Sequence, residues 1–154
     1  MKRMWLMAVL VTAASTAGRA EEPVLAPPTQ PGAPVVMTRL YTGPDGQTHA
    51  ETIELKLTRS GNTDGAGLLP VTGAEVHRHP AGSFSDWHQS PRRQYVITIS
   101  GHGEIELAGG QKIPVGPGHI DLVEDTTGKG HITRNAPDED RITIWLPLAD
   151  QAAR

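Results

Sequence analysis

Apolar and polar residues alternate along much of the chain from Val35 onward. Residues 52–57 read Thr-Ile-Glu-Leu-Lys-Leu, which is the twofold period of a strand with one buried face. Residues 94–100 read Gln-Tyr-Val-Ile-Thr-Ile-Ser, and their β-branched side chains favour the same structure. No segment after residue 20 has a helical period, so the pattern predicts a nearly all-β domain. Further strands are predicted at residues 71–79, 104–107, 111–115, 119–124, 130–134 and 141–148.

Glycine and polar residues separate these predicted strands. Gly109 and Gly110 lie between two alternating segments and predict a hairpin turn, whereas residues 60–67 are polar and glycine-rich and predict a loop. Many short strands joined by such turns are typical of a sandwich or a barrel. The interior of a small antiparallel barrel holds side chains or one small ligand.

The N-terminal 34 residues do not follow the strand pattern. Residues 1–20 have a basic start, a mostly apolar run at 4–12 and then small residues, which is the order of a secretory signal peptide. That run is short for a membrane span, and an uncleaved anchor is the alternative interpretation. Residues 21–34 contain five prolines and predict a flexible leader. The predicted β domain therefore covers residues 35–150, and the expected location is the periplasm or the exterior of the cell.

Charge and cysteine content exclude several classes of function. The 154-residue chain has a net charge of −3, and loss of the signal peptide would remove Lys2, Arg3 and Arg19 and make it more acidic. An acidic protein is not expected to bind nucleic acid, nor to associate stably with a membrane once the signal is cleaved. The chain contains no cysteine, which excludes disulfides, thiolate catalysis and cysteine-ligated zinc.

Five residues in the middle of the chain have a recognisable spacing. The segment Gly82-x5-His88-x-Ser90-x3-Gln94-x6-Gly101 has the frame of the first metal-binding motif of the cupins, Gly-x5-His-x-His-x3-4-Glu-x6-Gly. Serine replaces the second histidine of that motif, and glutamine replaces its glutamate.

A second segment resembles the other cupin motif, Gly-x5-Pro-x-Gly-x2-His-x3-Asn. Gly118 opens it and His131-x3-Asn135 closes it, although the interval is two residues longer and Glu124 stands at the proline position. Residues 91–95 and 124–131 are similar to a group of small bacterial cupins. The resemblance implies a single-domain double-stranded β-helix, or jelly-roll barrel.

The resemblance also implies which side chains enter the barrel mouth: His88, Ser90, Gln94 and His131. Two imidazoles are good ligands for Fe, Mn, Ni, Cu or Zn. Gln94 offers only a neutral carbonyl oxygen, and Ser90 is a poor ligand at neutral pH. The implied cofactor is a weakly held divalent transition metal at His88, His131 and Gln94, with a site that holds no metal as the alternative.

Other polar residues are further candidates for the site. His77 and His79 lie two apart and share one side of a strand; they are additional metal ligands if that side is inward, and exposed residues otherwise. Arg92 and Arg93 could bind a substrate carboxylate at the mouth, or form a solvated loop pair. Asp86 and Asp125 are metal ligands, turn residues or residues that orient a histidine. His49, His102 and His119 are expected to face solvent.

Two functions remain open from the sequence. The first is a metal-dependent enzyme, of the dioxygenase or isomerase type, which acts on a small organic molecule with a metal held by His88 and His131. The second is a cupin that binds a small ligand or a metal without turnover, which fits the loss of two motif ligands. Covering of sheet edges favours a homodimer.

Overall fold

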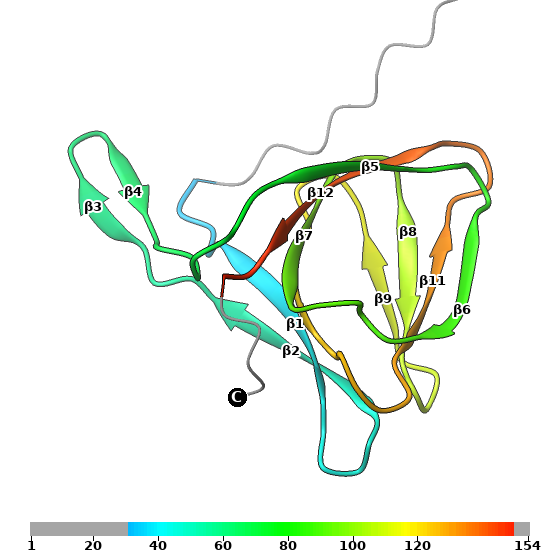
Figure 1. Cartoon of the computed structure of the whole chain (residues 1–154). Coiled ribbons are helices and arrows are strands. Elements are labelled where there is room, and N and C mark those ends of the chain that lie inside the picture. The colour runs from blue at the N-terminus through cyan, green and yellow to red at the C-terminus, as the bar shows by residue number, and fades with distance from the viewer. Residues whose placement is uncertain (1–30, 150–154) are drawn as a thin grey trace, which may run out of the picture.

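The computed structural model describes residues 31–149, which form strands and no helix (Figure 1). This confirms the all-β prediction. The predicted signal peptide at 1–20 and most of the leader lie outside the described residues, and within 31–149 no helix could cross a membrane. The strands are β1 (Val36–Thr42), β2 (Thr48–Glu54), β3 (Thr58–Ser60), β4 (Thr63–Gly65), β5 (Glu75–His79), β6 (Phe84–His88), β7 (Gln94–Ser100), β8 (Gly103–Glu106), β9 (Lys112–Val115), β10 (Ile120–Glu124), β11 (His131–Asn135) and β12 (Arg141–Pro147).

The last eight strands are divided equally between two facing layers. The order β5-β12-β7-β10 belongs to the larger sheet, and β6-β11-β8-β9 forms the smaller one. Strands that lie far apart in the chain are therefore neighbours in both layers: β5 lies next to β12, and β6 next to β11. This is the strand order of a jelly roll built from two Greek keys. This order confirms the predicted jelly-roll barrel from the topology of the chain itself.

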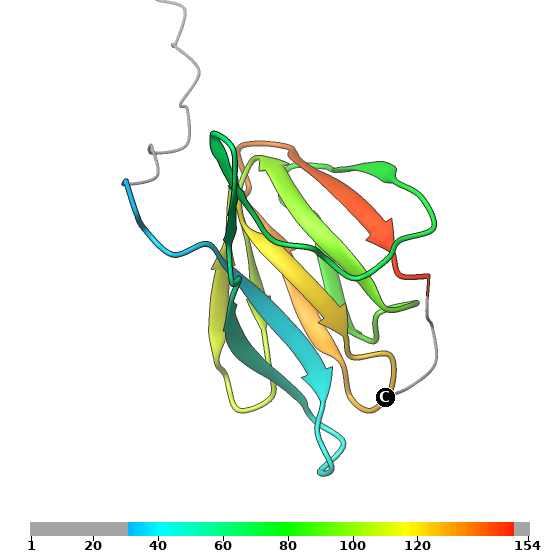
Figure 2. The same cartoon turned by 90° about the vertical axis from the view of Figure 1, so that its left-hand side faces the viewer.

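The first two strands extend the larger sheet. β1 pairs in parallel with β10, with Leu40 opposite Val123, and pairs antiparallel with β2. Figure 2 shows β1 beside β10 and the β1–β2 turn extending beyond the barrel. Pairing with β1 along its full length places β2 at Thr48–Glu54, four residues earlier than the alternation predicted.

A short ribbon replaces the loop that was predicted at residues 60–67. β3 and β4 pair antiparallel around a turn at Gly61, and every residue of the two strands is exposed. Because neither face of this ribbon packs on the core, its sequence has no alternation of apolar and polar residues. The periodicity that indicated most of the other strands was therefore absent here, and neither β1 nor β6 was predicted.

Apolar residues pack on both faces of the larger sheet. Inside the barrel they fill the space between the two layers, and outside they are covered by the segment that follows β2. Burial of each such side chain contributes about 1.5–3 kcal/mol. The buried inner residues are Leu40, Ile105, Leu107, Val115 and Val123, and the buried outer residues are Met37, Tyr95, Leu122 and Leu148.

Candidate functional site

A cavity of about 310 Å³ lies between the two sheets. Leu40, Val96, Ile105 and Val123 form its apolar wall. Polar side chains from both layers complete the lining, because alternate residues of each strand point into the barrel. The polar and charged residues of the lining are Arg78, His79, Ser83, Ser85, His88, Ser90, Gln94, Asp121, His131, Thr133, Asn135 and Arg141.

The two motif histidines lie side by side in this lining. His88 ends β6 and is the register partner of His131, which begins β11, and their ring centroids are 4.5 Å apart. Gly130 permits this approach, because a Cβ at that position would overlap the carbonyl oxygen of His88. Its φ of 75° is also in the left-handed region that favours glycine. The structure thus brings together two residues that lie 43 positions apart.

Hydrogen bonds fix which ring nitrogen of each histidine carries the proton. Nδ1 of His131 lies 2.6 Å from Oδ2 of the fully buried Asp125, and Nδ1 of His88 lies 2.8 Å from the carbonyl oxygen of Asp86. A carbonyl only accepts, so Nδ1 of His88 donates, and the carboxylate gives His131 the same tautomer. In the neutral ring each Nε2 then has a lone pair, and no residue of 31–149 hydrogen-bonds to it. Asp125 therefore orients a histidine, which is one of its predicted roles.

Gln94 and Ser90 also lie in the cavity wall, but both are engaged by the segment that precedes β7. Nε of Arg92 donates to Oε1 of Gln94 at 3.1 Å, and Nη2 of Arg92 donates to Glu75 at 2.6 Å. Oγ of Ser90 donates to the carbonyl oxygen of Arg92 at 2.7 Å. The oxygen that was predicted to contact a metal instead accepts a hydrogen bond from a cation.

These contacts decide how well the residues fit a metal. Zinc and similar ions are normally held by three or four protein ligands. Within residues 31–149 no three His, Cys, Asp or Glu side chains are grouped to hold an ion, and the guanidinium of Arg92 lies on the oxygen of Gln94. His88 and His131 alone do not fit such a centre, and the metal site stays a prediction.

The pair on β5 points inward, as one of the two alternatives expected. Val76 and Arg78 are exposed while His77 and His79 are partly buried. His79 lines the cavity and bonds Oγ1 of Thr143 at 3.0 Å. Burial first, and then the charges of Arg141 and His77, lower the pKa of His79 to about 4, so it is neutral at pH 7.

His77 does not reach the cavity lining. Its ring stacks on Trp145, with centroids 4.1 Å apart, and its Nε2 lies 3.0 Å from Glu75. Among the two histidines of β5, only His79 therefore belongs to the candidate site.

The adjacent arginines face opposite sides of the sheet, which corrects their prediction as a pair at the mouth. Arg92 contacts Gln94 on the inner side, whereas Arg93 is buried on the outer side and pairs with Glu124. Burial acts to raise the pKa of Glu124, but hydrogen bonds from Arg93 and Arg39 outweigh it and the net pKa is lowered. Arg93 therefore belongs to an outer ion-pair network and does not line the cavity.

Sequence reasoning missed Arg141, which begins β12 and lines the cavity. Its exposed fraction is only 4%. In the predicted strand 141–148, Arg141 shares the parity of Thr143, opposite to the apolar Ile142 and Ile144, but the sequence does not show which parity faces the cavity. In the structure the positive charge at that parity points into the barrel.

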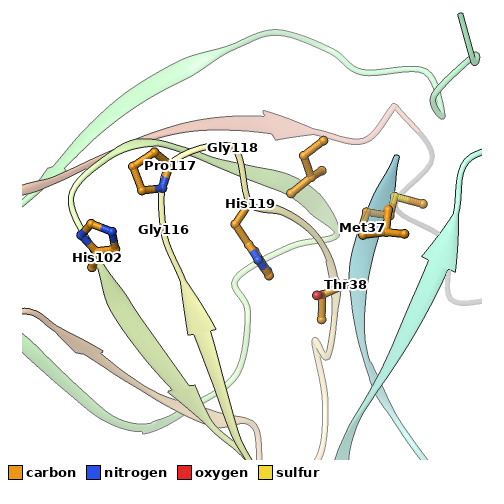
Figure 3. Close-up of a pocket in the computed structure, with 9 residues that line it drawn as sticks. Met37, Thr38, His102, Gly116, Pro117, Gly118 and His119 are labelled. Carbon is orange, nitrogen blue, oxygen red and sulfur yellow. The ribbon is translucent and has the colours of Figure 1, made fainter. Parts of the chain in front are cut away.

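A second hollow, of about 400 Å³, lies where the turn at residues 116–118 faces β1 (Figure 3). Its two histidines stand apart and each already meets a carboxylate. Nδ1 of His102 lies 2.5 Å from Glu139, and Nε2 of His119 lies 2.9 Å from Asp121. His119 is therefore partly buried rather than solvent-facing, which corrects its prediction. The barrel cavity remains the candidate site, because the two motif histidines and Arg141 line it.

Comparisons with known proteins complete this description. No protein-family model matches the chain, and no match is found among curated proteins. Solved structures that it resembles include the DMSP lyase DddQ from Ruegeria pomeroyi DSS-3, with 21% identity, a TM-score of 0.42, and coverage of 53% of this chain and 40% of that one. A cupin-2 domain protein from Rhodospirillum rubrum has 17% identity and a TM-score of 0.40, with 88% and 82% covered. A cupin protein from Bacteroides fragilis has 22% identity and a TM-score of 0.36, with 55% and 73% covered.

These likenesses carry no inference about activity or ligand, because their TM-scores are below 0.5. The chain spans about two fifths of the DMSP lyase. What the strand order and the cavity define is a small jelly-roll barrel with a polar pocket between its sheets.

Proposed function

We propose that this protein binds a small organic molecule in the barrel cavity, without a resident metal and without turnover. The observation that carries the proposal is the Arg92–Gln94 hydrogen bond, which occupies the oxygen that a metal would need. The N-terminal signal pattern supports an exported binding protein in the periplasm or outside the cell.

The cavity has the character of a small-ligand pocket. Its volume of about 310 Å³ is at the small end of the range for such sites, about 300–1,000 Å³. Leu40, Val96 and Val123 would bury the apolar body of the ligand. The Nε2 lone pairs of His88 and His131 would accept hydrogen bonds from its hydroxyl or amide groups.

A metal-dependent enzyme is the second candidate, and one observation favours it. Both rings donate their Nδ1 proton to an oxygen, which is the arrangement that ligating histidines usually have. A ligand that supplied further donor atoms itself could then complete a weak two-histidine site.

Metal content and ligand binding together distinguish the two candidates. Tag-free protein is analysed for Fe, Mn, Ni, Cu and Zn, and a panel of small carboxylates, amides and alcohols is screened by thermal shift. The expected result is substoichiometric metal and stabilisation by panel members. Stoichiometric metal that disappears in His88→Ala/His131→Ala would instead support the enzyme.

A cavity-filling variant shows whether the ligand lies inside the barrel. Thr133 lines the cavity on β11, so Thr133→Phe should abolish the stabilisation. Thr52→Phe places the same ring on an exposed position of β2 and serves as the control. Stabilisation that persists in Thr133→Phe, or its absence in the unmodified protein, would overturn the proposed function.

A further inference from the structure

Arg141 is a buried cation without an ion pair. Its Nε donates to Oδ1 of Asn135 at 2.7 Å and its Nη1 to Oγ1 of Thr98 at 3.3 Å. A guanidinium has five N–H groups, so these two contacts leave several donors without a described acceptor. Every other arginine in residues 31–149 pairs with a carboxylate: Arg39, Arg59, Arg78, Arg92, Arg93 and Arg134.

The surroundings of Arg141 disfavour its charge. Burial lowers the pKa of Arg141, and the attraction of Asp121 offsets this only in part. An arginine nevertheless stays protonated in a protein. Burying an unpaired charge is costly, and a partner that neutralises it would recover that cost. Because Arg141 lines the cavity, the partner can come from a ligand.

The position of Arg141 gives the cavity two chemically different ends. At one end the guanidinium lies beside Asn135, which ends β11. At the other end lie His88 and His131, and His131 begins the same strand. Four residues of a strand span about 13 Å, so a small molecule can reach from the cation toward the two imidazoles.

A carboxylate is the group that best matches the cationic end. Guanidinium and carboxylate form two parallel hydrogen bonds between opposite charges, which are stronger than neutral ones. His79, the register partner of Arg141, is neutral at pH 7. The other cation of the lining, Arg78, is exposed and pairs with Asp140. Asp121 is the only carboxylate of the cavity lining and already meets His119.

We propose that Arg141 binds the carboxylate of the ligand, and that the ligands are small organic acids whose other end hydrogen-bonds to His88 and His131. This inference rests on the proposed function, since it names the class of molecule that the barrel binds.

Matched acids and amides test the inference on the unmodified protein. Benzoate and benzamide have nearly the same shape and differ in charge, and their dissociation constants are measured by calorimetry in low-chloride buffer at pH 7. Benzoate is expected to bind at least about tenfold more tightly. Equal binding of the two probes would overturn the inference while leaving the proposed function intact.

Substitution of Arg141 tests the residue itself. Arg141→Gln should abolish the preference for benzoate and leave benzamide binding within about threefold, whereas Arg141→Lys should keep part of the preference because it keeps the charge. Arg59→Gln, on the exposed β3–β4 ribbon, is the control and should keep all of it. A preference that survives in Arg141→Gln would overturn the role of Arg141.

Two further outcomes do not depend on Arg141→Gln. If Arg141→Gln does not fold, the benzoate–benzamide difference together with Arg141→Lys still decides the inference. If neither probe binds the unmodified protein, and no neutral panel member does either, the proposed function fails and the inference fails with it.

Discussion

The two faces of the six-stranded sheet each bury an arginine, and they treat its charge differently. Arg93 on the outer face and Arg141 on the inner face are 5% and 4% exposed. Arg93 pairs with Glu124, whose pKa is lowered, whereas no carboxylate of residues 31–149 pairs with Arg141. Since the two side chains are buried to nearly the same extent, the two sites differ in whether the arginine has a carboxylate partner. The outer arginine completes a structural ion pair, and the inner arginine has the unsatisfied charge expected of a binding group.

The largest expected effect comes from disrupting the four-stranded sheet, which lies opposite that inner face, where His88 and His131 meet. Gly130→Ala would place a Cβ on the backbone of His88, so the β6–β11 pairing would have to shift. We expect a loss of about 4 kcal/mol or more of unfolding free energy, measured by urea denaturation. Gly110→Ala is the control, because its φ of 84° is similar but no atom lies within 4 Å of the added Cβ. A cost for Gly130→Ala no greater than that of Gly110→Ala would contradict the close approach.

The next largest loss of stability is expected when the outer arginine, Arg93, is replaced. Arg93→Gln leaves the carboxylate of Glu124, whose side chain is 10% exposed, with only Arg39 as a described ion-pair partner. Breaking a buried ion pair typically costs 3–5 kcal/mol, and the remaining pair with Arg39 argues for a value of about 3 kcal/mol. Urea denaturation of Arg93→Gln and Arg141→Gln side by side makes the comparison. An equal loss of unfolding free energy in the two variants would show that the two faces do not differ in how they stabilise a buried arginine.

A smaller effect is a dependence of stability on pH through His79, the register partner of Arg141. Its pKa of about 4 is below the ordinary value of 6.5, so between these values the unfolded chain binds more protons. Stability should therefore fall as the pH drops from about 6.5 toward 4. The loss is about 1–2 kcal/mol once solvent screening is allowed for.

His79→Gln supplies the control for this pH dependence, because the difference between the two pH profiles isolates the one residue. In Arg141→Gln the pKa of His79, followed by NMR, should rise only partly, since burial is the larger cause of its depression. Profiles of the unmodified protein and His79→Gln that coincide between pH 4 and 6.5 would rule out a neutral buried His79.

The smallest effect is expected for the ligand-free inner arginine. Arg141→Gln loses hydrogen bonds to Asn135 and Thr98 but also removes a buried charge that has no ion pair. These contributions oppose each other, so the unfolding free energy should change by less than about 1 kcal/mol. Differential scanning calorimetry without added carboxylate measures it. A loss as large as that of Arg93→Gln would mean that Arg141 is structural.

Much of the fold could be predicted from the sequence because half-buried strands carry a period of two. The alternation at 94–100 and 141–148 located β7 and β12 to within a residue. The motif spacing also placed His88 and His131 in one cavity wall. The exposed β3–β4 ribbon was missed, since a strand without a buried face has no such period.

The site was predictable only in part, because hydrogen-bond partners come from distant strands. Gln94 lies in the cavity wall as the resemblance implied, but the guanidinium on its oxygen could not be inferred from spacing. The same holds for the contact between His131 and Asp125, which fixes the proton on Nδ1. His77 and His79 share one side of β5, yet only His79 reaches the cavity.

The sequence by itself determined most of the strands and the parity of their side chains, since both follow from local backbone geometry. It did not determine which parity faces the cavity, nor which charges meet there. Arg92 and Arg93 are neighbours in the chain but lie on opposite faces of the larger sheet. Arg92 contacts Gln94 on the face that the second sheet covers, and Arg93 pairs with Glu124 on the outer face. Only the packing of two sheets against each other decided that Arg93 has a carboxylate partner and Arg141 does not.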